Sequence, residues 1–110
     1  MRVLFDQGTP VPLRRALPGH LVATVYELGW STLPDGPLLA AAEQAGYEVF
    51  ITTDQQLKHQ QHLAGRGLAI LVLGSTSWPR LAPHAEAIGQ LVGQLVAGDY
   101  REFPLPRTAG

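Results

Sequence analysis

Two aspartates of this 110-residue chain come directly after short apolar runs, and a third opens a predicted helix. Asp6 follows the run VLF, Asp54 follows VFI and two threonines, and Asp35 precedes a Gly-Pro pair. Carboxylates that lie within a few ångströms of one another repel, so a cluster of them is costly without a cation. Hard oxygen ligands suit Mg²⁺ or Mn²⁺, which help water to attack a phosphate. If the three meet, the chemistry they indicate is hydrolysis of a phosphodiester.

The same aspartates also have ordinary structural explanations. Asp35 and Asp54 occupy positions that favour a helix N-cap, and an N-cap needs no metal to explain it. Asp6 could instead accept bonds from the turn amides of Gly8 and Thr9. Glu27, at the end of another predicted strand, could face the same crevice or solvent. The residue types alone leave these alternatives open.

The elements that must position these residues alternate between strand and helix patterns. Strands are expected at residues 3–5, 20–26, 47–51 and 68–73, and helices at 10–17, 35–46, from 54 to 65 or 67, and 83–96. Thr9 is the expected N-cap of the first helix. Such alternation with short connections favours a parallel sheet with helices on both faces, whose ligands bind beyond the carboxyl ends of the strands. Asp6 and Asp54 should therefore leave the sheet at one edge, within reach of Asp35.

Composition limits the class of protein. A hydrophobic content of 45% supports one core, and the chain contains no cysteine for disulfides or thiolate zinc sites. No uncharged stretch approaches the roughly 20 residues that span a bilayer, so we expect a cytoplasmic protein without membrane contact. The net charge of −1 excludes the positive field of a dedicated nucleic-acid-binding domain. Arg14 and Arg15, which are adjacent, are typical of a solvated helix face.

Four segments together resemble a known family. The order LFDQGTP, ELGWSTLPDGPLLAAA, FITTDQQL and LAILVL, within residues 1–96, resembles the small PIN-like domains of the DUF5615 type. Those domains are similar to the ribonuclease toxins of bacterial toxin–antitoxin pairs. The resemblance implies a three-layer α/β/α PIN-like fold at residues 1–98, with a central, mostly parallel sheet of four to five strands. It also implies a nuclease that uses Mg²⁺ or Mn²⁺ on RNA, often with a partner antitoxin.

Carried over to this chain, the resemblance puts Asp6, Asp35 and Asp54 at the acidic positions, as metal ligands and catalytic residues. Thr52 or Thr53 would supply a neighbouring hydroxyl. Independently of the resemblance, the prolines of residues 99–110 predict a C-terminal tail or edge strand with a disordered end.

The chain also departs from the family pattern. Gln7 and Gly8 stand where relatives read Glu-Asn, and Gln56 stands where a second aspartate is common. Thr53 replaces a frequent basic residue. Gln56 can bind a metal-coordinated water, and Lys58 can touch an RNA phosphate from the first turns of its helix. With fewer charges, such a site should hold a divalent ion weakly, and a retained fold does not guarantee a retained reaction.

Other side chains permit further functions. His59 and His62 could share a zinc ion but lack a third ligand, which favours a solvated helix face. Trp30 and Trp78 could stack on bases or, as we expect, pack against helices. A C-terminal apolar row could form a homodimer face; it consists of Leu91, Val92, Leu95 and Val96.

The sequence therefore leaves three functions. The first is a metal-dependent ribonuclease. The second is a catalytically inactive module that binds RNA or a protein partner. The third is a phosphate-receiving regulatory domain built on Asp54 with Ser75 or Thr76, although no lysine follows LAILVL, where such domains need one.

Overall fold

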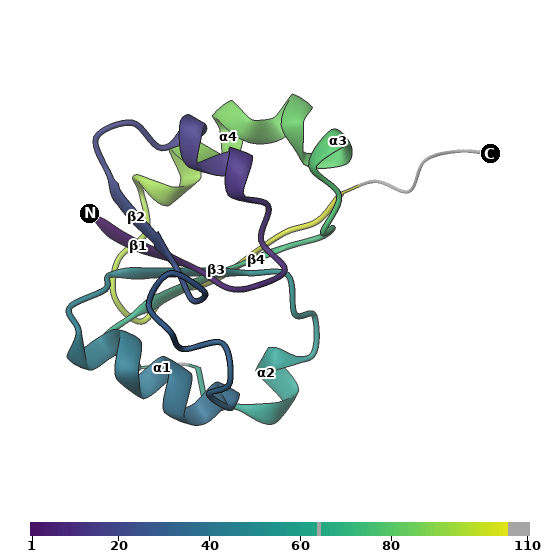
Figure 1. Ribbon diagram of the computed structural model, residues 1–110. Coiled ribbons are helices and arrows are strands. Elements are labelled where there is room, and N and C mark those ends of the chain that lie inside the picture. Colours follow the sequence, from purple (N-terminus) through teal and green to yellow (C-terminus); the bar gives the residue numbers. More distant parts are fainter. Residues whose placement is uncertain (64, 106–110) are drawn as a thin grey trace.

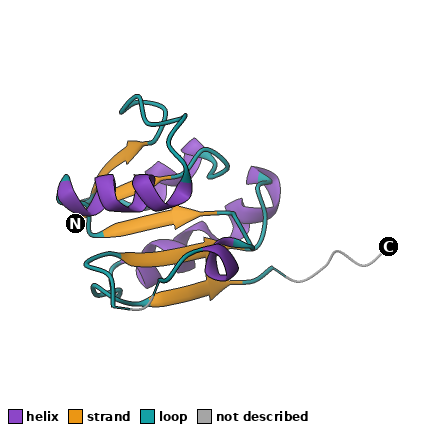
Figure 2. Cartoon of the chain, turned by 90° about the horizontal axis from the view of Figure 1, so that it is seen from below, coloured by secondary structure: helices purple, strands orange, loops and turns teal. Residues whose placement is uncertain are grey.

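A five-stranded parallel sheet forms the centre of the protein. The computed structural model describes residues 1–63 and 65–105. The strands are β1 (Arg2–Phe5), β2 (Leu21–Thr24), β3 (Val49–Thr52), β4 (Ala69–Leu73) and β5 (Tyr100–Phe103). They lie in the order β2-β1-β3-β4-β5 and all point the same way (Figure 2). The expected α/β class is confirmed.

Helices cover both faces of this sheet. They are η1 (Val11–Ala16), α1 (Asp35–Gln44), α2 (Leu57–Gln60), α3 (Trp78–Leu81), η2 (Ala82–His84) and α4 (Ala85–Val92), of which η1 and η2 are 3-10 helices. Helices α1 and α2 lie on one face, and η1, α3 and α4 lie on the other (Figure 1). Within the described ranges, none of these helices has the length and apolarity needed to cross a membrane.

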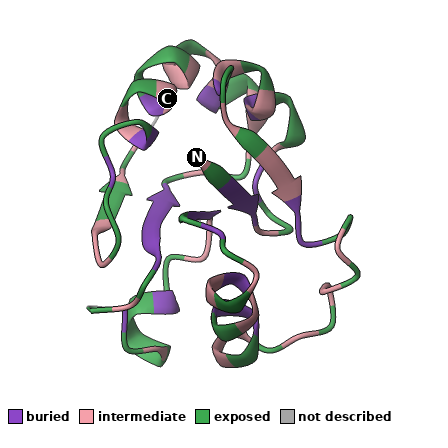
Figure 3. Cartoon of the chain, turned by 90° about the vertical axis from the view of Figure 1, so that its left-hand side faces the viewer, coloured by how far each residue is buried: buried purple, intermediate pink, exposed green. Residues whose placement is uncertain are grey.

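The strands divide the core into two halves because successive side chains point to opposite faces. Val3 and Phe5 of β1 face η1 and α4, whereas Leu4 faces α1. Every residue of β3 and β4 is buried, and Figure 3 shows the central strands in the buried colour. The strand expected at residues 68–73, LAILVL, is apolar on both faces and contains β4, which lies between β3 and β5 inside the sheet.

The connection from β4 to β5 brings α4 against η1. It crosses the same face as the connection from β1 to β2, although the two run in opposite directions along the sheet. The two crossovers therefore have opposite hands, which is uncommon in parallel sheets. Gly89 of α4 permits the contact, because a Cβ at this position would overlap the backbone carbonyl of Ala16.

Two helix predictions near the candidate site are wrong. The helix expected from residue 54 to 65 or 67 is only α2, and Gln61 after it has extended backbone angles. Among the described residues of this segment only Leu57 and Leu63 are buried, too few for a continuous apolar stripe. Thr9 does not cap the first helix: Pro10 precedes η1, and the buried Thr9 hydroxyl donates to the carbonyl oxygen of Ile51 at 2.9 Å.

The C-terminal third also differs in detail from the prediction. A single helix was expected over residues 83–96. The helical region instead begins earlier, with the short helices α3 and η2, and its regular part, α4, ends at Val92. Residues 100–103 form β5, the edge strand that was one of two expectations for the tail. The disorder expected at the very end falls on residues 106–110, which lie outside the described residues.

Candidate functional site

The candidate site lies where the strand order reverses. Strands β1 and β3 are neighbours. From β1 the chain goes on to β2, at one edge of the sheet, whereas from β3 it goes on to β4, toward the other edge. Ligands of doubly wound sheets bind at such a switch point, beyond the carboxyl ends of the strands. The backbone N–H of Asp6 donates to the carbonyl of Ile51 at 2.9 Å, so Asp6 extends the β1–β3 ladder into this crevice.

Thr52 connects the first and third predicted acids. Its fully buried hydroxyl donates to Oδ2 of Asp6 at 2.8 Å and accepts the backbone N–H of Asp54 at 3.1 Å. Because the oxygen accepts from Asp54, its single proton is directed at Asp6. Thr52 thus fixes the Asp6 carboxylate relative to the backbone of Asp54.

The carboxylates of Asp6 and Asp54 each accept a local backbone bond as well. Oδ1 of Asp6 accepts the N–H of Gln7 at 2.9 Å, and Oδ1 of Asp54 accepts the N–H of Gln56 at 2.9 Å. The second bond is an Asx turn, not an N-cap, because α2 begins only at Leu57. A carboxylate offers about four lone-pair sites. Both side chains therefore keep acceptor capacity after these bonds.

Asp35 lies within electrostatic reach of the other two acids. It is the first residue of α1, whose N-cap is Pro34, and its side chain makes no capping bond. The alternative reading of Asp35 as a cap is therefore wrong. Burial raises the pKa of the Asp35 carboxyl, and the negative charges of Asp54 and Asp6 raise it further. A pKa raised by neighbouring negative charges is expected when carboxylates lie close together.

The chemistry of this donor set fits a hard divalent ion. The repulsion among three carboxylates whose charges interact would be relieved by Mg²⁺ or Mn²⁺, which prefer oxygen ligands. However, over residues 1–63 and 65–105 no group of three or more histidine, aspartate or glutamate side chains is already arranged to hold a metal ion. Asp6 and Asp54 are joined through Thr52, and Asp35 interacts with them by charge alone.

The predicted substrate-binding residues divide into two groups. Thr53 is half-buried next to Gly8, and Gln56 is exposed beside Asp54. Lys58 instead turns to β5, where its Nζ lies 3.0 Å from a carboxylate oxygen of Glu102. This bond raises the pKa of Lys58. Because Lys58 is the only lysine in the chain, the regulatory-domain hypothesis lacks a lysine beside Asp54.

Gln55 has a structural role that the sequence did not reveal. Its Nε2 donates to the carbonyl oxygen of Leu73 at 2.6 Å and to that of Thr53 at 3.2 Å. The side chain therefore joins the exits of β3 and β4. No local pattern could have indicated this bond, since its partners lie 18 residues apart.

Asp6 also lines a hollow of about 420 Å³ beyond the ends of β1 and β2. One wall is an ion pair between the guanidinium of Arg14 and the carboxylate of Glu27. The hydrogen bond from Arg14 lowers the pKa of Glu27. The same carboxylate oxygen accepts the N–H of Thr24 at 3.1 Å. Arg14 was expected on a solvated helix face, and the sequence left Glu27 between the crevice and solvent. The ion pair between them, which forms this wall, was not predicted.

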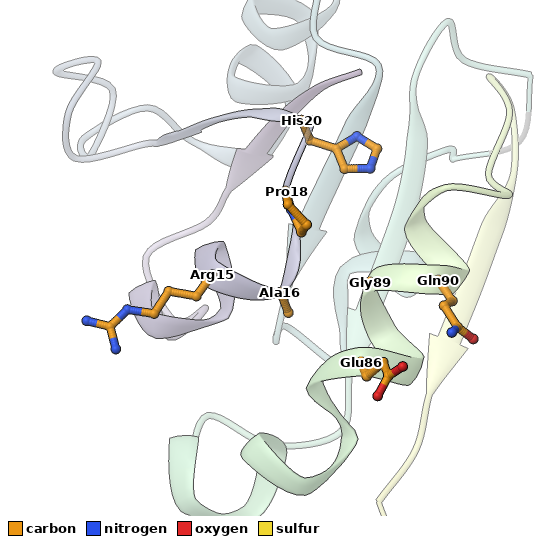
Figure 4. A pocket seen from close by; sticks show the side chains of 7 residues that line it. All are labelled: Arg15, Ala16, Pro18, His20, Glu86, Gly89 and Gln90. Carbon is orange, nitrogen blue, oxygen red and sulfur yellow. The ribbon is translucent and has the colours of Figure 1, made fainter.

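A second hollow, of about 430 Å³, lies at the opposite end of the sheet (Figure 4). His20, on one side of it, has its Nδ1 3.2 Å from the N-terminal amino group, at the start of β1. Glu86 and Gln90 come from α4, and the Arg15 side chain extends away from the other labelled residues. None of the predicted site residues lines this hollow, so it is a weaker candidate.

The remaining sequence candidates are largely structural. Trp30 packs edge-to-face on Tyr47, with ring centroids 6.3 Å apart, and Trp78 packs against the core beside α4. The packing expected for both tryptophans is confirmed. Two members of the apolar row proposed as a dimer face, Val92 and Leu95, are buried in the core, whereas Val96 is exposed.

Comparison of this chain with protein family models, curated proteins and solved structures gave no match. The resemblance to PIN-like domains therefore rests on the short motifs and their places in the fold.

Proposed function

We propose that this protein is a Mg²⁺- or Mn²⁺-dependent endoribonuclease of the PIN-like type. The observation that carries the proposal is the Thr52 hydroxyl, which joins the Asp6 carboxylate to the backbone of Asp54 at the exits of neighbouring strands. The pKa of Asp35, raised first by burial and then by the charges of Asp54 and Asp6, supports it. Three acids from three different segments interact at the switch point, where ligands of such sheets bind. A divalent cation is the simplest chemical reason to bring them together.

Each residue has a distinct role in this proposal. Asp6 and Asp54 would bind the ion, and Asp35 would complete the site directly or through water. When bound, a divalent ion supplies an acidic water and a positive charge beside the phosphate. Thr52 holds Asp6 in its orientation, and Thr53 and the Gln56 amide offer polar contacts to substrate or water at the rim.

The proposal includes a weak metal site and a protein partner. Gln56 supplies no charge where relatives have an acid, so millimolar metal should be needed for activity. A cognate antitoxin is the partner we propose by analogy, and the cytoplasm is the compartment where such a nuclease would meet RNA.

An RNA cleavage assay with Mn²⁺ tests this function. Wild type should cut a single-stranded RNA, and Asp54→Asn should lose the activity while keeping an oxygen for the Gln56 N–H. Asp99→Asn is the matched control, because the Asp99 carboxylate accepts the N–H of Val96 in the turn before β5 and lies outside the proposed site. Equal cleavage by wild type and Asp54→Asn would indicate a contaminating nuclease and contradict the proposal.

The second candidate is a catalytically inactive module of the same fold. It is favoured by the backbone bonds that Asp6 and Asp54 already accept, and by the lack of a preformed three-residue metal group in the described chain. Such a module would bind RNA or a protein partner with no dependence on divalent ions. Binding without cleavage at any Mn²⁺ concentration would identify it.

A further inference from the structure

The hollow beside Asp6 has an unusually apolar rim for a surface site. Val11 and Tyr26 are 53% and 80% exposed, and both line the hollow. Large apolar side chains left in water around a concavity indicate a binding surface. The volume of about 420 Å³ is within the range of small-molecule pockets.

One wall of the hollow is fixed by hydrogen bonds. Glu27 accepts from both Arg14 and the N–H of Thr24, and its own N–H donates to the Thr24 hydroxyl at 3.0 Å. These bonds fix the position of the Arg14 guanidinium in the lining. The hollow therefore has a preformed polar wall beside its apolar rim.

We propose that this hollow binds one nucleobase of a single-stranded RNA substrate, next to the bond that is cut. The inference rests on the proposed function, because Asp6 belongs to both the hollow and the proposed metal site. A base has a flat face that can stack on Tyr26, and edge groups that can pair with polar side chains of the lining.

The charges of the hollow favour a base over a phosphate. The carboxylates of Asp6 and Glu27 both line it and would repel a phosphate, whereas a neutral base carries no such penalty. The exposed amide of Gln7, also in the lining, can pair with the edge of a base. Tyr26 is therefore a substrate-binding residue, and Arg14 and Gln7 contribute to base preference.

The test is binding of a short single-stranded RNA that carries one 2-aminopurine, measured in EDTA and again with Ca²⁺. Tyr26→Ala should weaken binding about tenfold or more, since stacking on an aromatic side chain contributes on this scale. Tyr26→Phe should keep wild-type affinity. Leu21→Ala is the matched control, because Leu21 is 71% exposed on neighbouring β2 but does not line the hollow. The 2-aminopurine fluorescence should be quenched by wild type, Tyr26→Phe and Leu21→Ala, but not by Tyr26→Ala.

The possible outcomes separate this inference from the proposed function. Binding and quenching that depend on Tyr26, without cleavage in Mn²⁺, would support the nucleobase site and overturn the nuclease. Cleavage with the same KM in wild type and Tyr26→Ala would support the nuclease and overturn the nucleobase site. Equal binding by wild type, Tyr26→Ala and Leu21→Ala, or no RNA binding by wild type, would also overturn the nucleobase site. Equal affinity for single-stranded DNA would overturn the restriction to RNA.

Discussion

The hydroxyl of Thr52 lies 2.8 Å from Oδ2 of Asp6 and joins the exits of two neighbouring strands. Because the same oxygen accepts the N–H of Asp54, one uncharged side chain orients the first acid and fixes the backbone of the third. The site therefore depends on a residue that supplies neither charge nor metal ligand. Its contribution can be measured without any assumption about catalysis.

Thr52→Val should destabilise the fold by about 1–3 kcal/mol, the usual effect of leaving buried polar groups without a partner. Valine has nearly the same shape, so the loss reports the two hydrogen bonds and not a cavity. Urea denaturation followed by circular dichroism measures the change. Thr52→Ser, which keeps the hydroxyl and loses one methyl group, should cost only about 0.8 kcal/mol. A valine variant as stable as wild type would show that these bonds contribute nothing to stability.

Millimolar Mn²⁺ should raise the melting temperature of wild type, because an ion that binds only the folded state stabilises it by mass action. Asp6→Asn should remove most of this rise, since it deletes a charge from the proposed site. Differential scanning fluorimetry with Mn²⁺ and Mg²⁺ titrations measures both. Asp99→Asn should respond like wild type. A wild type unaffected by either ion would favour the catalytically inactive module.

The contribution of Asp35 to stability should fall with rising pH. Its pKa is raised in the folded state, first by burial and then by Asp54 and Asp6, so the folded protein binds the proton more tightly than the unfolded chain. The contribution is complete below the ordinary aspartate pKa of about 3.9 and is lost as pH rises through the higher folded value. Thermal melts across acidic pH should show the stability of wild type declining relative to that of Asp35→Asn, a comparison that cancels the opposite contribution of carboxyls with lowered pKa such as Glu27.

The single variant Asp6→Asn tests one cause of that decline. One of the charges that raise the pKa of Asp35 is then gone, so the decline should end at lower pH than in wild type. An unchanged profile would mean that Asp6 does not raise the pKa of Asp35. In that case Asp6 and Asp35 would not be coupled, and the argument for a metal site shared by these two acids would fail.

Sequence patterns predicted the strands of the sheet well, because each strand is a short apolar run that can be recognised from neighbouring residues alone. The run LAILVL is apolar on both faces and contains the inner strand β4, and the acids that follow β1 and β3 are at the strand exits. The convergence of Asp35 on that edge also follows from chain order once the strands are parallel. Residue type and strand direction together were therefore sufficient for the outline of the site.

The parts that could not be predicted depend on contacts between distant residues. Arg14 and Glu27 form a wall of the hollow only because η1 folds back over the exit of β2. Lys58 was expected near substrate, but Glu102, 44 residues away, binds it. Threonine is a residue type that favours N-caps, yet the Thr9 hydroxyl donates to a backbone carbonyl oxygen of β3. Local propensity is overridden in each case by a partner that sequence spacing does not reveal.

The contact between α4 and η1 provides a test of the fold itself. Gly89→Ala would push a methyl group into the carbonyl oxygen of Ala16, and backbone on both sides leaves little room to move. We expect a loss of about 1–3 kcal/mol, the usual cost of overpacking. Gly93, at the end of the same helix, is the matched control: its nearest neighbour would be the Gln90 carbonyl at 3.5 Å, and its φ of −64° suits any residue. Gly93→Ala should therefore be neutral or stabilise by about 0.4–1 kcal/mol. Chemical denaturation of both variants measures the difference, and equal effects would show that α4 does not cross η1 at Gly89.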